Sequence, residues 1–144
     1  MDIDRIMSEI EQYQPLKELH KKGKDVGRYI LNKYFSEVPY TKERKLWELR
    51  FFYENIEFIT KKWILEIIWE LETYKGSNFN ELKRAIKGIS SRVLSIRLKE
   101  LEKTGIISRN VQNTHPPKVF YQLSQKGKGF VELMVILILA LKYF

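Results

Sequence analysis

Basic side chains are the main chemical feature of this 144-residue chain, and they gather in one stretch. Residues 75–128 hold 12 Lys and Arg against three acidic residues, a local charge of +9, whereas the whole chain carries +8. Clustered Lys and Arg displace condensed counterions from nucleic acid, so this stretch is a candidate polyanion-binding surface. A solvated basic surface is the other interpretation of the charge alone, and the spacing of the residues has to decide between them.

The sequence contains few of the residues that usually catalyse reactions or bind metal ions. The absence of Cys excludes a disulfide scaffold, a thiolate zinc site, a cysteine nucleophile and a thiol redox sensor. The two histidines, His20 and His115, lie far apart in the sequence. Glu66, Glu70 and Glu100 are single carboxylates on predicted helices, a pattern more typical of surface ion pairs than of catalytic acids or bases. We therefore expect no enzyme, no metal site and no cofactor.

The spacing within the basic stretch predicts two helices joined by a tight turn. Asn78 and Glu81 have the spacing of a capping box at the start of the first helix. Residues 87–89 then form a turn of about three residues, the length found within a helix-turn-helix. Ser90 or the residue after it begins the second helix, which runs to about Lys103 and is followed by a glycine.

The second helix has two unlike faces. Leu94, Leu98 and Leu101 share one narrow arc at helical spacing and must face the core. The opposite arc is basic and polar apart from Ile96. An apolar side chain there suits contact with a thymine methyl group, although a single exposed Ile is also common. The pattern predicts a helix that enters the major groove of DNA.

Two strands follow, at residues 106–111 and 119–123, and both are rich in β-branched or aromatic residues. The loop between them contains two adjacent prolines, which stiffen it and reduce the entropy lost on ordering. Such a wing suits contact with the minor groove or the DNA backbone through Asn113, His115 and Lys118. For His115, contact with a DNA phosphate and the absence of any functional role are equally weighted alternatives.

The expected DNA contacts come from both helices, the turn and the wing. Arg92, Ser95, Ile96 and Lys99 are expected near base edges, while the other lysines position the duplex through its phosphates. The complete set is Asn80, Lys83, Lys87, Ser90, Ser91, Arg92, Ser95, Ile96, Lys99, Lys103, Asn113, His115 and Lys118.

A final helix, which Ser124 can cap, is apolar almost all the way round from residue 130 to 141. The twelve residues of this apolar stretch reach roughly 18 Å as a helix, which falls short of the bilayer core of about 30 Å. We therefore expect it to pack against protein, with peripheral membrane attachment as a minor alternative. A second copy related by a two-fold axis would cover it, and packing against residues 1–59 is the competing explanation. The expected dimer-interface residues are Phe52, Tyr53, Ile56, Phe130, Met134, Leu137, Ile138 and Leu141.

Residues 1–40 are predicted to form a helical extension, and residues 41–144 a DNA-binding domain with a C-terminal dimerisation helix. Helical spacing of apolar residues runs from residue 3 to 13, and Pro15 marks a break. Thr41 is expected to cap the next helix and Thr60 the one after it. The acidic start of the chain has no apolar run typical of a signal peptide, so a cytoplasmic location is expected.

Several separated blocks resemble the HxlR-type transcriptional regulators, over roughly residues 48–143. These blocks are Lys62-Trp63, Phe79 to Arg84, Gly88 to Ser95, Arg97 to Glu102, Gly105, and Pro116 to Val119. The resemblance implies a mostly α-helical winged helix-turn-helix with a small β-hairpin wing and additional terminal helices. It also implies a dimeric DNA-binding regulator of bacteria or archaea in which the terminal helices make the dimer and residues 91–103 read the major groove.

Departures from the family pattern affect recognition and signalling more than the fold. Many members have a sensing cysteine near the first family helix, and this chain has none. Phe120 replaces a usual acid, Asn78 a frequent basic residue, and Ile96 a usual polar residue. These changes leave the operator sequence undefined.

The resulting expectation is a homodimeric regulator that binds a palindromic double-stranded DNA operator. A winged-helix module that binds another protein through the apolar stripe and Ile96, without direct DNA binding, is the alternative. Apolar space beside the terminal helices could also admit a small-molecule effector, but no polar anchor in the sequence identifies one.

Overall fold

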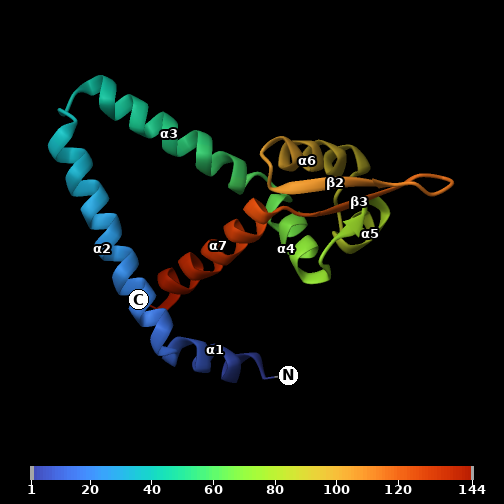
Figure 1. The fold of residues 1–144 in the computed structure, drawn as a ribbon, viewed down its shortest axis with the longest axis horizontal. Coiled ribbons are helices and arrows are strands. Elements are labelled where there is room, and N and C mark those ends of the chain that lie inside the picture. The colour runs from blue at the N-terminus through green and yellow to red at the C-terminus, as the bar shows by residue number, and fades with distance from the viewer. Residues whose placement is uncertain (1, 144) are drawn as a thin grey trace. The chain divides into compact units, whose positions relative to one another are not determined.

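The computed structural model describes residues 2–143, and its elements are mostly helices with one small antiparallel sheet (Figure 1). In chain order they are α1 (Ile3–Gln12), α2 (Gln14–Glu37), α3 (Lys42–Thr60), α4 (Ile64–Tyr74), β1 (Ser77–Asn78), α5 (Phe79–Ala85), α6 (Ser91–Lys103), β2 (Ile107–Gln112), β3 (Lys118–Leu123) and α7 (Gln125–Tyr143). The mostly helical, winged helix-turn-helix fold predicted from the sequence is confirmed. Within residues 2–143, no helix is both long and apolar enough to span a bilayer.

Contacts divide the chain into two compact units. We call residues 53–134 the winged unit, and the residues up to 52 together with those from 135 onward the arm unit. Helices α3 and α7 each have residues in both units. The boundary expected at residue 41 was drawn from sequence pattern rather than from contacts, and it stays a prediction.

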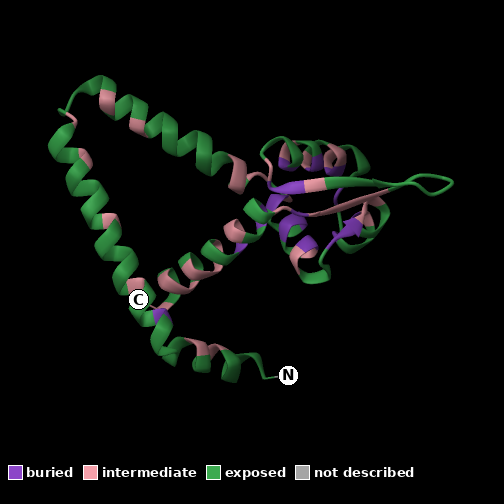
Figure 2. Ribbon diagram, viewed as in Figure 1, coloured by how far each residue is buried: buried purple, intermediate pink, exposed green. Residues whose placement is uncertain are grey.

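The winged unit has a core between its helices and its sheet. The strand order is β1-β3-β2, and both pairings are antiparallel. Helix α4 places Ile64, Ile67, Ile68 and Leu71 in this core, where each is almost fully buried. Further buried positions come from β1, α5, the turn between α5 and α6, α6, the segment before β2, both long strands and the first turns of α7, as the purple segments of Figure 2 show. This core fixes the positions of α5 and α6.

Local signals at the helix ends act as the sequence predicted. The Asn78 side chain accepts a hydrogen bond from the Glu81 amide at 3.0 Å, and the Glu81 carboxylate accepts one from the Asn78 amide at 2.8 Å. The Ser90 hydroxyl caps α6 by accepting from the Val93 amide at 3.1 Å. Gly105 follows α6 with a φ of +73°, a left-handed conformation that glycine adopts without strain. These caps set the start of α5 and both ends of α6.

Two features around α4 differ from the sequence prediction. Thr60 was expected to cap α4, and this is wrong: its hydroxyl lies in the last turn of α3 and donates to the carbonyls of Ile56 and Glu57. The residue at the N-cap of α4 is Trp63, in a left-handed conformation with a φ of 78°. Strand β1 was not predicted, because it has only two residues and exists through its pairing with β3.

The arm unit begins with two amphipathic helices. Pro15 lies in the first turn of α2, where its missing N–H costs no helical hydrogen bond. From there α2 continues without interruption through Gly23 and Gly27. Among the residues of this unit that the structure describes, Leu16 alone is buried. The arm unit therefore has little core of its own.

Candidate nucleic-acid interface

Helix α6 presents the two faces that its sequence predicts. Leu94, Leu98 and Leu101 are 0 to 2% exposed. On the other side, Arg92 and Lys99 are exposed, together with Lys103 in the last turn. Ser95 is half-buried and Ile96 is 43% exposed. The α6 surface thus combines cationic side chains with one apolar group, a mixture that suits phosphates and a thymine methyl group.

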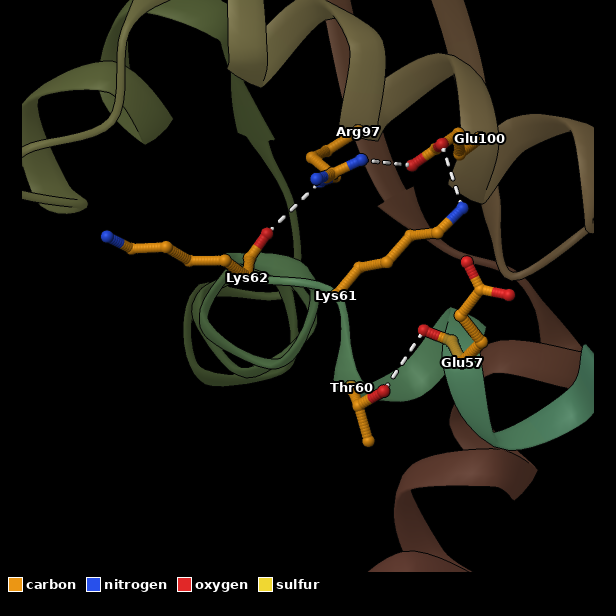
Figure 3. Close-up of polar contacts among 6 residues, drawn as sticks. All are labelled: Glu57, Thr60, Lys61, Lys62, Arg97 and Glu100. Carbon is orange, nitrogen blue, oxygen red and sulfur yellow. Dashed lines mark hydrogen bonds and ion pairs between the residues drawn. The ribbon is translucent and has the colours of Figure 1, made fainter. Parts of the chain in front are cut away.

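A polar network holds α6 to the junction between α3 and α4 (Figure 3). Arg97 donates from Nε to the Lys62 carbonyl at 3.1 Å and from Nη1 to the Glu100 carboxylate at 2.9 Å. Lys61 donates to the other oxygen of Glu100 at 3.2 Å. Arg97 is therefore occupied in support of the helix, although it lies in the basic stretch. Sequence alone could not separate it from the exposed cations.

The charge of Glu100 is stabilised by this arrangement. Burial raises the pKa of the carboxyl group, but hydrogen bonds and charge attraction from Arg97 and Lys61 outweigh burial and leave the pKa below its ordinary value. The carboxylate is therefore ionised at neutral pH and bridges two cations. This bridge ties α6 to the end of α3 and so limits how far the helix can shift.

The turn before α6 is supported by Trp63. A Cβ atom added to Gly88 would lie 3.5 Å from Cη2 of the indole, so the ring lies against the turn. Gly88 itself has a φ of +90°, which favours glycine. The Lys62 ammonium lies 4.7 Å from the centroid of the Trp63 ring. The unusual backbone of Trp63 thus places its ring under the helix-turn-helix.

The residues predicted on α5 and the turn lie at the surface. Asn80 and Lys87 are exposed, and Lys83 is half-buried. Asn80 and Lys118 line one groove of about 260 Å³ between the start of α5 and the base of the wing. The structure therefore brings together two predicted contacts that are far apart in sequence. Ser90 and Ser91 are exposed at the start of α6, where the Ser90 hydroxyl is already engaged in the cap.

A second groove, of about 350 Å³, runs between α6 and the sheet. Ser95 and Lys99 line it from α6, and Arg109 and Tyr121 line it from strands that place these two residues directly opposite each other. Glu102 also lines this groove, which limits its positive charge. Arg109 was not predicted from the sequence, because only the fold of the strands places it beside the same space as Lys99.

The wing loop is fully at the surface. Asn113, His115 and Lys118 are exposed. The loop is held by the Thr114 hydroxyl, which donates to the Pro116 carbonyl at 2.8 Å, and by the Thr114 amide, which donates to the Gln112 carbonyl at 2.8 Å. The three predicted side chains are thus accessible to a duplex.

The predicted interface residues also leave apolar surface open within each unit. In the winged unit Tyr53 and Ile56 are exposed, whereas Phe130 and Met134 are half-buried. Leu133, which was not predicted, is 69% exposed. In the arm unit the predicted residues are all exposed: Phe52, Leu137, Ile138 and Leu141. Open side chains of this size at several positions are typical of a surface that a partner covers.

The model of the family described as HxlR-like helix-turn-helix matches residues 58–142. This range contains α4, both helices of the motif, the wing and nearly all of α7. Residues 2–40, with α1 and α2, lie outside it.

The relatives with curated descriptions carry the names of regulatory proteins, most of them HTH-type transcriptional regulators. An uncharacterised HTH-type transcriptional regulator of Bacillus subtilis, YvaP, is 36% identical over 58% of this chain and 76% of its own. The putative regulatory protein MalR of Fusobacterium mortiferum is 33% identical over 72% of this chain and 84% of its own. The solved structure of the reduced form of the transcriptional regulator YodB of B. subtilis has a TM-score of 0.51 at 34% identity, over 57% of this chain and 83% of that one.

Proposed function

The chain belongs to the HxlR-like helix-turn-helix family, and from this premise we propose that it is a homodimeric transcriptional regulator that binds a palindromic double-stranded DNA operator. The observation that carries the proposal is the exposed cationic face of α6 opposite three buried leucines. That face suits a polyanion, and a helix of 13 residues held on a compact core fits the major groove. In a bacterial or archaeal cell this DNA lies in the cytoplasm.

Base recognition is assigned to the exposed face of α6. Arg92 and Lys99 suit guanine or phosphate, Ser95 suits either polar base edge, and Ile96 suits the methyl group of thymine. Lys83, Lys87, Lys103 and Lys118 position the duplex through its phosphates, with Asn80, Ser90 and Ser91 beside them. Asn113 and His115 extend from the wing toward the backbone or the minor groove. To this set we add Arg109 as a phosphate contact beside Lys99.

The dimer is assigned to the open apolar residues of α3 and α7. A two-fold axis would place the two α6 helices on one face of the duplex, with half-sites about 10 base pairs apart or a multiple of that.

The variant Leu137→Glu tests this dimer, because it puts a charge among the open apolar residues of α7. It is expected to shift the protein from dimer to monomer in analytical sedimentation. DNA affinity should fall with it, because each monomer then binds a half-site alone.

The DNA test begins with selection of bound fragments from genomic DNA by the purified protein. Affinity for the selected duplex is then measured for the double variant Arg92→Glu and Lys99→Glu, which is expected to bind at least about a hundredfold more weakly. The matched control is Lys42→Glu with Lys45→Glu, which makes the same change of charge on exposed positions of α3. Full affinity of a folded, dimeric Arg92/Lys99 variant would show that α6 does not read DNA.

Binding of another protein through the same face remains the competing function. The apolar exposure of Ile96 is the feature that favours it. Lysine is depleted at the centres of protein interfaces, so the basic surroundings of Ile96 favour DNA. Two results together would select the protein-binding function instead. The protein would not bind duplex DNA at low salt, and it would bind a heterologous protein in a way that Ile96→Lys abolishes.

A further inference from the structure

Helices α1 and α2 lie outside the family-matched residues, and each has an apolar strip that is largely uncovered. On α1 the strip consists of Ile3, Ile6, Met7 and Ile10, of which Ile3 is 58% and Ile6 41% exposed. On α2 the strip runs along one side and is made of Leu16, Leu19, Gly23, Val26, Gly27, Ile30, Leu31 and Tyr34. No Lys, Arg, Asp or Glu interrupts either strip.

The chain itself does not cover the middle of the α2 strip. Apart from the backbone of α2 itself and the residues next to each glycine, no atom of residues 2–143 lies within 4 Å of where a Cβ on Gly23 or Gly27 would stand. Val26 and Ile30, between and beside these glycines, are both 58% exposed. In particular α1 does not fold back onto this part of its own α2. The strip is therefore available to another helix.

The charges beside the two strips are opposite. Residues 2–12 have four acidic side chains and one Arg, whereas α2 has six Lys and Arg and three acidic residues. At helical spacing, Asp4 and Glu11 flank the α1 strip, and Lys17, Lys21 and Lys24 flank the α2 strip. Within the described part of the chain, none of these five forms an ion pair. If the α1 strip packs on the α2 strip, the acidic residues beside the first strip lie next to the lysines beside the second.

We propose that α1 of one copy docks on the α2 strip of a second copy, reciprocally about the two-fold axis. The inference rests on the homodimer of the proposed function and adds to it a surface that the family model does not contain. A membrane surface suits α1 poorly, because its acidic flank is repelled by anionic lipids.

The available area is sufficient for a stable contact. The two strips contain six large apolar side chains that are 41 to 58% exposed: Ile3, Ile6, Leu19, Val26, Ile30 and Leu31. At roughly 100 Å² each, they offer about 600 Å² per copy, and thus about 1,200 Å² for the pair. Stable protein interfaces bury about 1,200 to 2,000 Å² or more in total.

The first test uses the absence of native cysteine. Two differently tagged proteins are mixed and oxidised, one carrying Met7→Cys in the α1 strip and the other Gly27→Cys in the α2 strip. Each chain then has one thiol, so any disulfide between the two tags joins α1 of one copy to α2 of another. We expect efficient formation of this mixed disulfide. The control replaces Met7→Cys by Gln12→Cys, which points away from the strip and should form little of it.

The second test exploits the charge pattern. The variant Asp4→Lys with Glu11→Lys and the variant Lys21→Glu with Lys24→Glu should each raise the dissociation constant of their homodimer at least about tenfold. Mixed together, they should form a heterodimer of near-native affinity, because each contact then joins opposite charges again. The pair Lys42→Glu and Lys45→Glu serves as the control for net charge.

The outcomes separate this inference from the proposed function. A native dimer that binds DNA but gives no mixed disulfide and no heterodimer preference overturns the α1–α2 contact and leaves the proposed function standing. A protein that is monomeric at all concentrations overturns both. A last outcome comes from labelling the Met7→Cys thiol with a maleimide. If cell extract or phosphatidylglycerol vesicles protect this thiol but a raised concentration of the protein does not, the α1 strip binds another occupant. That result also overturns the inference.

Discussion

At the scale of single residues, the basic stretch divides by what each cation touches. Arg97 donates to Glu100 and to the Lys62 carbonyl, so its guanidinium group is engaged in contacts within the winged unit. Lys61 is likewise paired with Glu100. Arg92 and Lys99, on the same helix as Arg97, remain exposed. A count of charges in the sequence therefore overestimates the cations available to DNA, and contacts are needed to select them.

Arg109→Ala provides a test of the groove between α6 and the sheet. If Arg109 meets a backbone phosphate, its loss should weaken binding by a similar factor for specific and nonspecific duplexes and reduce the slope of log affinity against log salt by about 1. Titrations at several salt concentrations measure both quantities. A loss confined to the selected operator would instead mean that Arg109 reads a base.

The Glu100 bridge predicts a pH dependence of stability. The pKa of Glu100 is lower in the folded protein than its ordinary value of 4.5, so the carboxylate stabilises the fold above that pH. This contribution is lost as the pH falls below 4.5 through the folded-state pKa.

The variant Glu100→Gln should therefore lower the free energy of unfolding at pH 7 by about 1 kcal/mol, as expected for a partly exposed network. It should also flatten the decline of that free energy below about pH 5. Urea denaturation across this pH range gives both results. The exposed Glu102→Gln is the control on the same helix, and an identical pH profile for the two variants would contradict the role of the bridge.

At the scale of elements, the sequence predicted well what depends on near neighbours. The capping box of α5, the serine cap of α6 and the leucine arc of α6 involve residues a few positions apart, and all are present. Strand β1, the left-handed Trp63 and the groove beside Arg109 depend on pairing or packing with distant residues, so no local pattern indicated them. For Thr60, the carbonyls of its own preceding turn competed with the expected cap.

The start of α7 supplies a matched pair of glycines for a stability test. A Cβ on Gly127 would lie 2.1 Å from the Ile106 carbonyl oxygen, whereas a Cβ on Gly129 would meet nothing within 4 Å. Gly127→Ala should therefore destabilise the protein by about 1 to 3 kcal/mol through overpacking. Gly129→Ala should leave stability unchanged or raise it by up to about 1 kcal/mol. Chemical denaturation of both variants measures the difference, and equal values would contradict the close approach of α7 to Ile106.

At the scale of the whole molecule, the lack of cysteine limits how the regulator can be controlled. A thiol oxidant such as diamide has no group to oxidise, so DNA affinity should be the same before and after treatment. Binding assays with and without the oxidant check this expectation. A change in affinity after treatment would point to chemistry at other side chains, the three methionines first among them.

The Trp63 ring that lies against Gly88 has a practical consequence. An indole in a half-buried site changes its fluorescence when neighbouring groups move or when water is excluded from around it. Trp47 and Trp69, the other two tryptophans, are more than half exposed and can be replaced by phenylalanine. With excitation at wavelengths that tryptophan absorbs and tyrosine does not, the remaining emission would come from Trp63 alone, so this ring would report rearrangement beside the turn before α6 without an attached dye.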